Sequence, residues 1–402
     1  MTHRTLPRIL GLAAIGALLV APASAQDDVV LTTAVPFLQI EPDSRAAGMG
    51  MTGVALADNA YAPFWNPAGL AGQEGTEVSF THAPWLPALG ADLSYDHLTA
   101  KHGLGRAGTL GGHLTYFDLG RQIATDEQGN VIGDPEGFSS YELSLGASYG
   151  YPVTENLSVG TGARLIYSNL TGGFSVEDAE TSAGVSVGVD LGVKYTAPDI
   201  GLGQSSRPTL AFNLANMGPG VSYTSNNNYP DAIPTTLRFG GALDTQLDEF
   251  NRVVLALDLN KVLVRPRIDT TATGDLVRTY DPFYEAIFTS WETRRIKTAR
   301  GVQGTCAELE VDDDTSNDCR DISALRSLTL GAGLEYWYND LLALRGGYFY
   351  EDPANGNRQF VTFGAGFRYS LVGVDISYIY ALEEDSPLAD QLRFSLLLNV
   401  PR

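Results

Sequence analysis

Residues 184–195 read GVSVGVDLGVKY, and every second residue of this stretch is bulky and apolar. The intervening positions carry serine, glycine, aspartate and lysine, so the two classes alternate with a period of two. Successive side chains of a β-strand point to opposite faces, whereas a helix repeats roughly every 3.6 residues. The stretch therefore predicts a strand with one apolar face and one small or polar face.

The same alternation recurs through the chain after residue 75, for example in SYELSLGASYGY at 140–151. No later stretch reaches the roughly 18 apolar residues that a membrane-spanning helix needs. We count 14 alternating runs, near 76–82, 92–101, 107–117, 140–150, 156–167, 184–196, 208–216, 235–245, 252–262, 325–338, 341–350, 359–370, 372–381 and 390–400.

The connections between these runs alternate between short and long. Short turns such as YPVTEN are followed by longer segments, of which 263–324 is the longest and is strongly acidic. Short turns at one end and long loops at the other are typical of outer-membrane barrels. The pattern predicts an all-β, 14-stranded antiparallel transmembrane barrel over 76–402, with 263–324 as an outward loop. A soluble sandwich or propeller also uses many short strands, but it does not need a continuous apolar band across all of them.

The first 25 residues predict a secretory signal peptide. Arg4 and Arg8 precede the apolar run ILGLAAIGALLVA at 9–21, and Ala23-Ser24-Ala25 provides small residues for cleavage before Gln26. An apolar run this short suits a signal peptide better than a membrane span. We therefore expect an exported chain that resides in the outer membrane.

The chain is acidic, with a formal net charge of −21. Removal of the signal peptide leaves 24 basic and 47 acidic residues, a net charge of −23. Nucleic acid is excluded as a partner because binding it requires a basic surface. Adaptation to a salt-rich environment and simple acidity of the surface loops both explain the charge.

A glycine-rich stretch, RAAGMGMTGVALADN at 45–59, raises the possibility of a nucleotide site. Gly48, Gly50 and Gly53 spell G-x-G-x-x-G, and Glu74 lies about twenty residues further on, where a ribose-binding carboxylate is sought. Such a site needs parallel strands joined by crossover helices, and antiparallel strands follow here instead. We expect no cofactor, and we interpret the glycines as sites of close backbone packing.

Residues 26–75 lack the strand alternation and are rich in glycine and alanine. A compact segment ahead of a barrel predicts a plug inside the lumen. Besides the three glycines, Phe64, Trp65, Asn66 and Pro67 are the residues that we assign to this plug.

Cys306 and Cys319 bracket a polar stretch in the acidic segment. In an oxidising compartment an even pair predicts a disulfide, with free thiols as the alternative. Metal binding is not expected there, because no histidine is nearby. The acidic cluster at 310–318 offers oxygen ligands for calcium but lacks the spacing of a known calcium loop, so a solvated loop is the simpler interpretation.

Histidine and serine residues near the first strands offer no diagnostic catalytic or metal-binding pattern. His82, His97, His102 and His113 fall close together, with Ser79 and Ser94 nearby, yet their spacing fits neither a triad nor a ligand set. We expect a protein that is not an enzyme. Charged residues on the predicted inward faces are expected to fill the lumen with ion pairs or to line a channel: Arg164, Asp190, Lys194, Arg238, Asp258, Glu335, Arg345 and Asp375.

The first predicted outward loop, within APWLPAL, carries Trp85, Leu86, Pro87 and Leu89. Exposed apolar residues on loops mark protein contacts, so these four are candidates for partner binding. Tryptophan also anchors barrels in the lipid headgroup region, and the sequence alone leaves both roles open.

Several stretches, in order along the chain, resemble the PorV family, a branch of the FadL-like outer-membrane barrels. The N-terminal signature is the most specific, because FadL-like plugs share its Asn-Pro-Ala. The matching stretches are PFLQIEPDSRAAGMGMTGVA with FWNPAGLA, FTHAPWLPAL, ALDLNKVLVRP, GLEYWYNDLLALRGGYFYED, FVTFGAGFRYSL and SPLADQLRFSLLL.

The resemblance implies a role in type IX secretion. PorV-like proteins collect cargo with a C-terminal signal domain as it leaves an SprA-like translocon. They deliver it to a cell-surface attachment complex that contains PorU, a sortase-like transpeptidase. The expected partners are therefore cargo, translocon, attachment complex and outer-membrane lipid. A FadL-like passive transporter of hydrophobic small molecules is the alternative. The long acidic segment 263–324 and the non-aromatic C-terminus depart from the family pattern.

Overall fold

The computed structural model describes residues 31–89, 92–125, 129–132, 134, 136–172, 181–224, 229–270, 276–297, 319–383 and 386–400. The signal peptide, Cys306 and the acidic cluster at 310–318 lie outside these residues.

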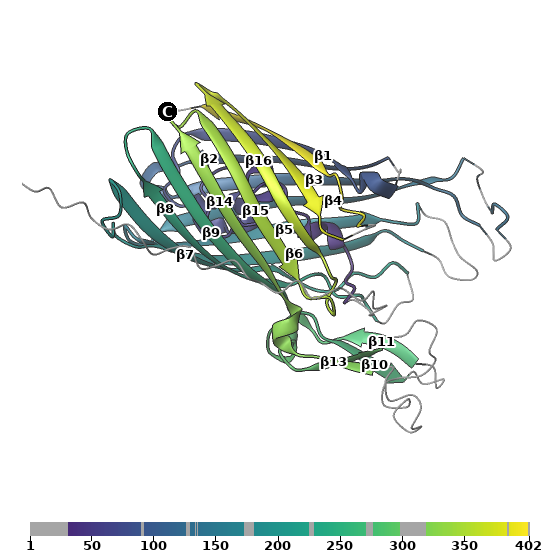
Figure 1. The fold of residues 1–402 in the computed structure, drawn as a ribbon. Helices are drawn as coiled ribbons and strands as arrows, with labels where there is room; N and C mark the ends of the chain where they lie inside the picture. Colours follow the sequence, from purple (N-terminus) through teal and green to yellow (C-terminus); the bar gives the residue numbers. More distant parts are fainter. Residues whose placement is uncertain are drawn as a thin grey trace, which may run out of the picture.

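The body of the molecule is a closed antiparallel barrel of fourteen strands (Figure 1). Its order around the barrel is β1-β18-β17-β16-β15-β14-β9-β8-β7-β6-β5-β4-β3-β2, and β1 pairs with β2 to close the ring. The predicted fold class is confirmed, strand by strand. The strands are β1 (Thr76–Trp85), β2 (Leu93–Gly103), β3 (Thr109–Gln122), β4 (Phe138–Pro152), β5 (Leu157–Asn169), β6 (Gly184–Thr196), β7 (Ser205–Met217), β8 (Thr236–Gln246), β9 (Asn251–Val262), β14 (Leu328–Tyr338), β15 (Leu342–Glu351), β16 (Gln359–Tyr369), β17 (Val372–Ala381) and β18 (Leu392–Val400).

The alternation seen in the sequence becomes the two faces of the barrel wall. Along β6, Val185 is 57% exposed and Val187 is 50% exposed, whereas Ser186 and Asp190 are buried. Apolar side chains therefore point outward to lipid, and small or polar ones point into the lumen. The predicted inward charges follow this rule, since all eight lie in the lumen or at its wall, and only Lys194 is not fully buried.

The segment between β9 and β14 holds more regular structure than a loop. It contains two short hairpins and a helix that project from the outward ends of these strands (Figure 1). We call its described residues, 263–270, 276–297 and 319–327, the loop module. Its elements are β10 (Pro266–Thr270), β11 (Leu276–Tyr280), α3 (Phe283–Thr289), β12 (Arg294–Lys297), β13 (Cys319–Ile322) and η6 (Ala324–Ser327).

The N-terminal segment, residues 31–75, packs against inward-facing side chains around the barrel. Residues 34–40 form an apolar cluster with Tyr95, Phe117 and Ile233 near the outward end. Gln73 lies against Gly103, at the end where the short turns are. The segment therefore extends along the lumen from one end of the barrel to the other.

Short helices within this segment begin where capping or proline favours them. The side chain of Asp43 accepts the backbone N–H of Ala46 at the start of α1 (Ser44–Ala47). Proline lies in the first turn of η1 (Pro36–Gln39), α2 (Ala62–Trp65) and η2 (Pro67–Leu70). Each is too short to be stable alone and depends on burial against the wall. Among the described residues, no helix combines the length and apolarity needed to cross a membrane.

Two further helical turns lie in the loops between early strands, η3 (Pro87–Leu89) and η4 (Gly105–Ala107). η3 follows β1 at the outward end, and η4 forms the short turn between β2 and β3. The first predicted outward loop is thus partly ordered as a helical turn.

Candidate functional site: a cavity at the outward end of the lumen

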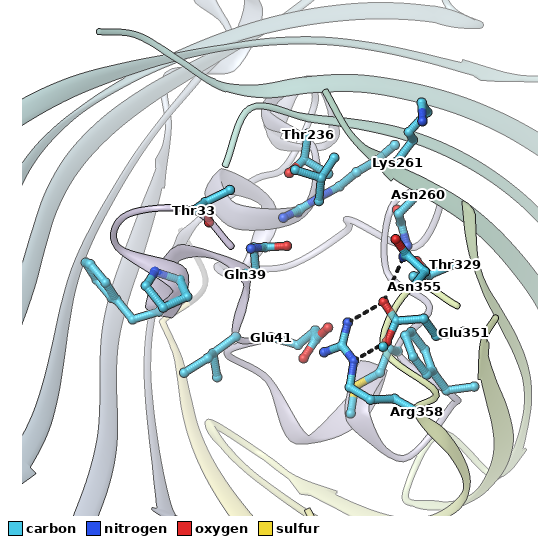
Figure 2. Close-up of a pocket in the computed structure, with 18 of the residues that line it drawn as sticks. Thr33, Gln39, Glu41, Thr236, Asn260, Lys261, Thr329, Glu351, Asn355 and Arg358 are labelled. Carbon is cyan, nitrogen blue, oxygen red and sulfur yellow. Dashed lines mark hydrogen bonds and ion pairs between the residues drawn. The ribbon is translucent and has the colours of Figure 1, made fainter. Parts of the chain in front are cut away.

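A cavity of about 440 Å³ lies at the outward end of the barrel (Figure 2). It is bounded by the start of the N-terminal segment, by the outward ends of the strands and by the loop at 352–358. Ligand pockets typically measure about 300–1,000 Å³. The cavity is therefore large enough for a small ligand or for a few side chains of a protein partner.

Aromatic rings form much of its wall. Phe349 and Phe360 stack with centroids 4.7 Å apart, and Trp85 contacts Phe117 edge-on at 6.0 Å. Arginine side chains lie over several of these rings. The guanidinium carbon is 5.5 Å from the Phe349 ring for Arg358, 4.5 Å from Phe64 for Arg238 and 5.8 Å from Trp85 for Arg393. Such cation–π contacts hold the arginines against an apolar surface.

The polar part of the wall centres on Glu351 at the end of β15. Its carboxylate accepts hydrogen bonds from Arg358 Nε at 2.6 Å and Nη2 at 3.2 Å, and from Asn355 Nδ2 at 3.0 Å. The adjacent Glu351 carboxylate holds the pKa of Arg358 above its ordinary value. Figure 2 shows the carboxylate of Glu41 pointing toward the same guanidinium from the opposite wall.

Among the described residues that line the cavity, basic side chains outnumber acidic ones, although the chain is acidic. The basic residues are Arg238, Lys261, Arg358 and Arg393, and the acidic ones are Glu41 and Glu351. Arg238 and Arg393 are buried, with exposures of 5% and 1%, whereas the Arg358 side chain is 49% exposed. Arg358 is therefore the accessible arginine of this cavity.

The N-terminal segment lies below the cavity, and close backbone approach holds it there. A Cβ built on Gly48 would be 3.0 Å from Gly364 Cα on β16, whereas one on Gly53 would be 2.2 Å from the ring of Trp65 within the same segment. Gly50 has a φ of +67°, and a Cβ there would be 2.5 Å from the Ala332 carbonyl oxygen. The glycine pattern that resembles a phosphate loop is thus a packing pattern.

Buried charges fasten the same segment to the wall. Glu335 on β14 accepts hydrogen bonds from Arg45 Nη2 at 2.8 Å and from Arg345 Nε at 2.7 Å, and Arg345 Nη1 reaches Asp375 at 2.7 Å. Asp258 on β9 accepts the backbone N–H groups of Gly53 and Val54 at 2.7 Å and 2.9 Å. Charge-assisted bonds are stronger than neutral ones, so this network resists displacement of the segment.

Asn66 and Trp65 complete the attachment. Asn66 Nδ2 donates to the carbonyl oxygens of Val193 and Phe212 on neighbouring strands, while its Oδ1 accepts the Ala68 N–H at 3.0 Å. Trp65 Nε1 donates to Asp43 at 2.5 Å, and burial raises the pKa of that carboxyl although these hydrogen bonds oppose the rise. Pro67 and Phe64 are buried beside them. The structure therefore brings the predicted plug residues together.

The predicted partner-contact residues lie in different surroundings. Trp85, the last residue of β1, shares the inward parity of Ala83, and its ring lines the cavity beneath Arg393. It is therefore turned away from the lipid headgroups. Leu86 follows with a φ of +49°, and Pro87 is exposed at the start of η3. The side chain of Leu89 lies outside the described residues.

The histidines divide between the two faces. His97 and His113 stack at 5.7 Å in the lumen, whereas His82 pairs with Asp96 on the outer face at 2.8 Å and His102 contacts Thr76. No cluster of three or more metal-ligating side chains occurs in the described part of the chain.

A family model described as "Type IX secretion system protein PorV" matches residues 23–269. The chain belongs to the PorV family. This membership places it among type IX secretion proteins of the outer membrane. The matched region includes the whole N-terminal segment and the strands through β9.

Solved structures of similar fold share little sequence with this PorV-family chain. The Ralstonia pickettii toluene transporter TbuX has 16% identity and a TM-score of 0.48, with coverage of 90% of this chain and 98% of that chain. The Pseudomonas putida toluene transporter TodX has 15% identity and a TM-score of 0.46, with coverage of 89% and 96%. A Pseudomonas aeruginosa FadL homologue has 11% identity and a TM-score of 0.44, with coverage of 92% and 99%. No curated protein matches the sequence.

Sequence reasoning singled out some residues of the cavity, namely Phe64, Trp65, Trp85 and Arg238, but it missed Glu41, Glu351 and Arg358. Arg358 stands outside any alternating run, in the loop DPANGNR. Its place against Glu351 depends on the turn at 352–357, in which the Asp352 carbonyl oxygen accepts the N–H groups of Asn355, Gly356 and Asn357. The sequence does contain one signal for Glu351, because this residue has the same inward parity as Phe349 at the end of β15.

Proposed function

We propose that this PorV-family barrel is a type IX secretion shuttle. It binds cargo carrying a C-terminal signal domain as the cargo leaves an SprA-like translocon, and it delivers that cargo to a PorU-like attachment complex. The single observation that carries the proposal is the family match. The structure supports it through the position of the cavity, which lies at the end of the barrel where the long loops emerge.

The filled lumen supports an adaptor over a channel. Residues 31–75 act as a plug in this proposal, because the buried ion pair of Arg45 with Glu335 on β14 and the hydrogen bonds from the Gly53 and Val54 N–H groups to Asp258 on β9 hold them against the wall. Breaking a buried pair costs about 3–5 kcal/mol. A binding surface needs no path through the barrel, so a fixed plug is compatible with the shuttle role.

The contact surface that we assign to cargo is the outward mouth of the barrel. It consists of the cavity, with Trp85 at its wall, and of Leu86, Pro87 and Leu89 beside it. Aromatic and arginine side chains are enriched where binding energy concentrates in protein interfaces. The paired aromatic and arginine side chains of this cavity fit that composition.

Affinity capture from gently solubilised outer membranes tests the proposal. A tagged chain should retain secreted proteins that share a C-terminal signal domain, together with a very large translocon barrel. A chain that retains only lipids or fatty acids would exclude the shuttle role. A charge-reversed Arg252→Glu variant, altered at the short-turn end, is the matched control and should capture cargo normally.

A passive transporter of hydrophobic small molecules is the second candidate. The aromatic wall of the cavity favours it, since Phe349, Phe360 and Phe64 offer an apolar ligand a dry surface. Such a transporter must move the N-terminal segment or open the wall to pass its ligand. Uptake of a labelled hydrocarbon by vesicles that contain the pure protein would support this role.

A further inference from the structure

We propose that the outward cavity binds a carboxylate attached to an apolar or aromatic group, with Arg358 holding the carboxylate and the phenylalanine rings holding the apolar part. The site deepens the proposed function, because cargo is one source of such a group. A free fatty acid is the other source of the same chemistry.

The first argument is the unused hydrogen-bonding capacity of Arg358. A guanidinium has five N–H donors in a planar fork. The hydrogen bonds from Nε and Nη2 to Glu351 hold one edge of that fork. In the described part of the chain the other edge has no hydrogen-bond partner, and the side chain is 49% exposed. That free edge matches a carboxylate in a bidentate arrangement.

The second argument is how the guanidinium is held in place. Glu351 is 5% exposed, and Asn355 donates a further hydrogen bond to it, so the carboxylate is fixed. The guanidinium also lies over the Phe349 ring at 5.5 Å. Because both restraints act before any ligand arrives, little side-chain freedom remains to be lost on binding.

The third argument is charge. The described residues of the cavity lining include two more basic than acidic side chains, in a chain whose net charge is −21. The excess is small, and among the described lining residues only one arginine is accessible, so the charge suits a singly charged anion. Glu41 faces Arg358 across the cavity (Figure 2) and competes with such an anion for the guanidinium.

The apolar part of the ligand lies against the rings beside Arg358. Phe349 and Phe360 stack at 4.7 Å and both line the cavity next to Arg358. A volume of about 440 Å³ accommodates an aromatic residue with its neighbours, or a medium-length acyl chain. Charge at one side and rings at the other therefore select an amphipathic anion.

Titration calorimetry on the full chain in lipid nanodiscs tests this site. The probes are acetyl-Phe-Leu-Phe with a free C-terminus against its C-terminal amide, and dodecanoate against dodecanol. At least one carboxylate should bind about tenfold more tightly than its neutral partner, a gain of about 1.4 kcal/mol. Arg358→Gln should abolish that preference, Arg358→Lys should keep part of it, and Glu41→Gln should strengthen it severalfold.

A control variant tests whether the preference for carboxylate probes arises at this site. Arg252→Gln removes an equally charged side chain at the opposite end of the barrel and should leave the preference intact. Equal binding of charged and neutral probes, or a preference that survives Arg358→Gln, would overturn the proposal. A preference for the peptide identifies cargo as the source, and a preference for dodecanoate identifies a fatty acid. Cargo capture is measured separately, so failure of the carboxylate site leaves the shuttle proposal to its own test.

Discussion

Single residues decide how the N-terminal segment fits the barrel, and Gly50 is the clearest case. Its φ of +67° lies in the left-handed region, and a Cβ there would meet the Ala332 and Tyr348 carbonyl oxygens at 2.5 Å. Gly72 has a similar φ of +75° but nothing within 4 Å of a built Cβ. The two positions therefore separate backbone strain from close packing.

Gly50→Ala should lower the free energy of unfolding by about 2–5 kcal/mol, because strain and overlap add. Gly72→Ala should lose only the strain, about 1–2 kcal/mol. Urea titration of the protein in phospholipid vesicles measures both. Equal losses at the two glycines would show that the contact between Gly50 and the wall adds nothing.

Glu335 is the central hydrogen-bond acceptor of the lumenal charge network. It is fully buried and accepts hydrogen bonds from both Arg45 and Arg345. Glu335→Gln would remove the carboxylate charge that neutralises these two arginines. We therefore expect the free energy of unfolding to fall by about 3–5 kcal/mol in the same urea titration. Asp340, a 78%-exposed carboxylate 3.9 Å from Arg252, provides the control, and Asp340→Asn should change stability little. A similar small change for Glu335→Gln would contradict a structural role for the network.

At the scale of elements, the loop module is held together at Asp281, between β11 and α3. Its carboxylate accepts hydrogen bonds from Arg267 Nη2 at 2.9 Å and from Thr289 Oγ1 at 2.6 Å. The bonds from Arg267 hold the pKa of Asp281 below its ordinary value, against the opposing effect of burial. A depressed pKa stabilises the folded module above the unfolded pKa of about 3.9, and the stabilisation is lost as the pH falls through the folded pKa.

Asp281→Asn should therefore make the module more susceptible to protease at neutral pH, with cleavage roughly five- to tenfold faster as local opening becomes easier. The difference from the unmodified chain should shrink below about pH 4, where Asp281 of the opened module becomes protonated, and it should be lost as the pH falls through the lower pKa of the folded module. Glu285→Gln, on the exposed face of α3, is the matched control. A difference between Asp281→Asn and the unmodified chain that stays constant down to pH 3 would rule out this ion pair as its cause.

The barrel strands were predictable from sequence because each one has a face in lipid and a face in the lumen. Val185 and Val187 report that alternation directly, and so do their counterparts in all fourteen strands. The hairpins of the loop module have no such constraint. β12 and β13 are four residues each, too short to show a repeating pattern of apolar residues. Period-two reasoning cannot detect strands of that kind.

The candidate site was less predictable, because it combines residues from distant parts of the chain. The sequence singles out Trp85 because it lies in the first predicted outward loop. Only the alternation of buried and exposed residues along β1 shows that its ring points inward. Glu41 and Arg358 are separated by more than three hundred residues and meet only when the barrel closes around the N-terminal segment. Cys306 lies outside the described residues, so the disulfide between Cys306 and Cys319 stays a prediction.

At the scale of the whole molecule, the question is whether the N-terminal segment must move for the protein to work. Ser44 in this segment and Ser395 on β18 bring their Oγ atoms to 2.9 Å, and both residues are buried. Replacing both by cysteine would place two sulfurs near the bonding separation of about 2.05 Å. Cys306 and Cys319 would be changed to serine in the same chain, so that only the new pair can form.

The chain with this new disulfide should capture cargo as well as the reduced chain, to within about twofold, because the proposed shuttle role places cargo at the outward mouth and requires no passage through the lumen. Each single cysteine variant and a reduced sample are the controls, and affinity capture with quantified cargo is the measurement. A transporter that displaces its plug predicts the opposite, since hydrocarbon uptake would fall on oxidation and return on reduction. Loss of cargo capture that reduction restores would show that the segment moves during secretion. The fixed plug would then have to be abandoned while the family role stands.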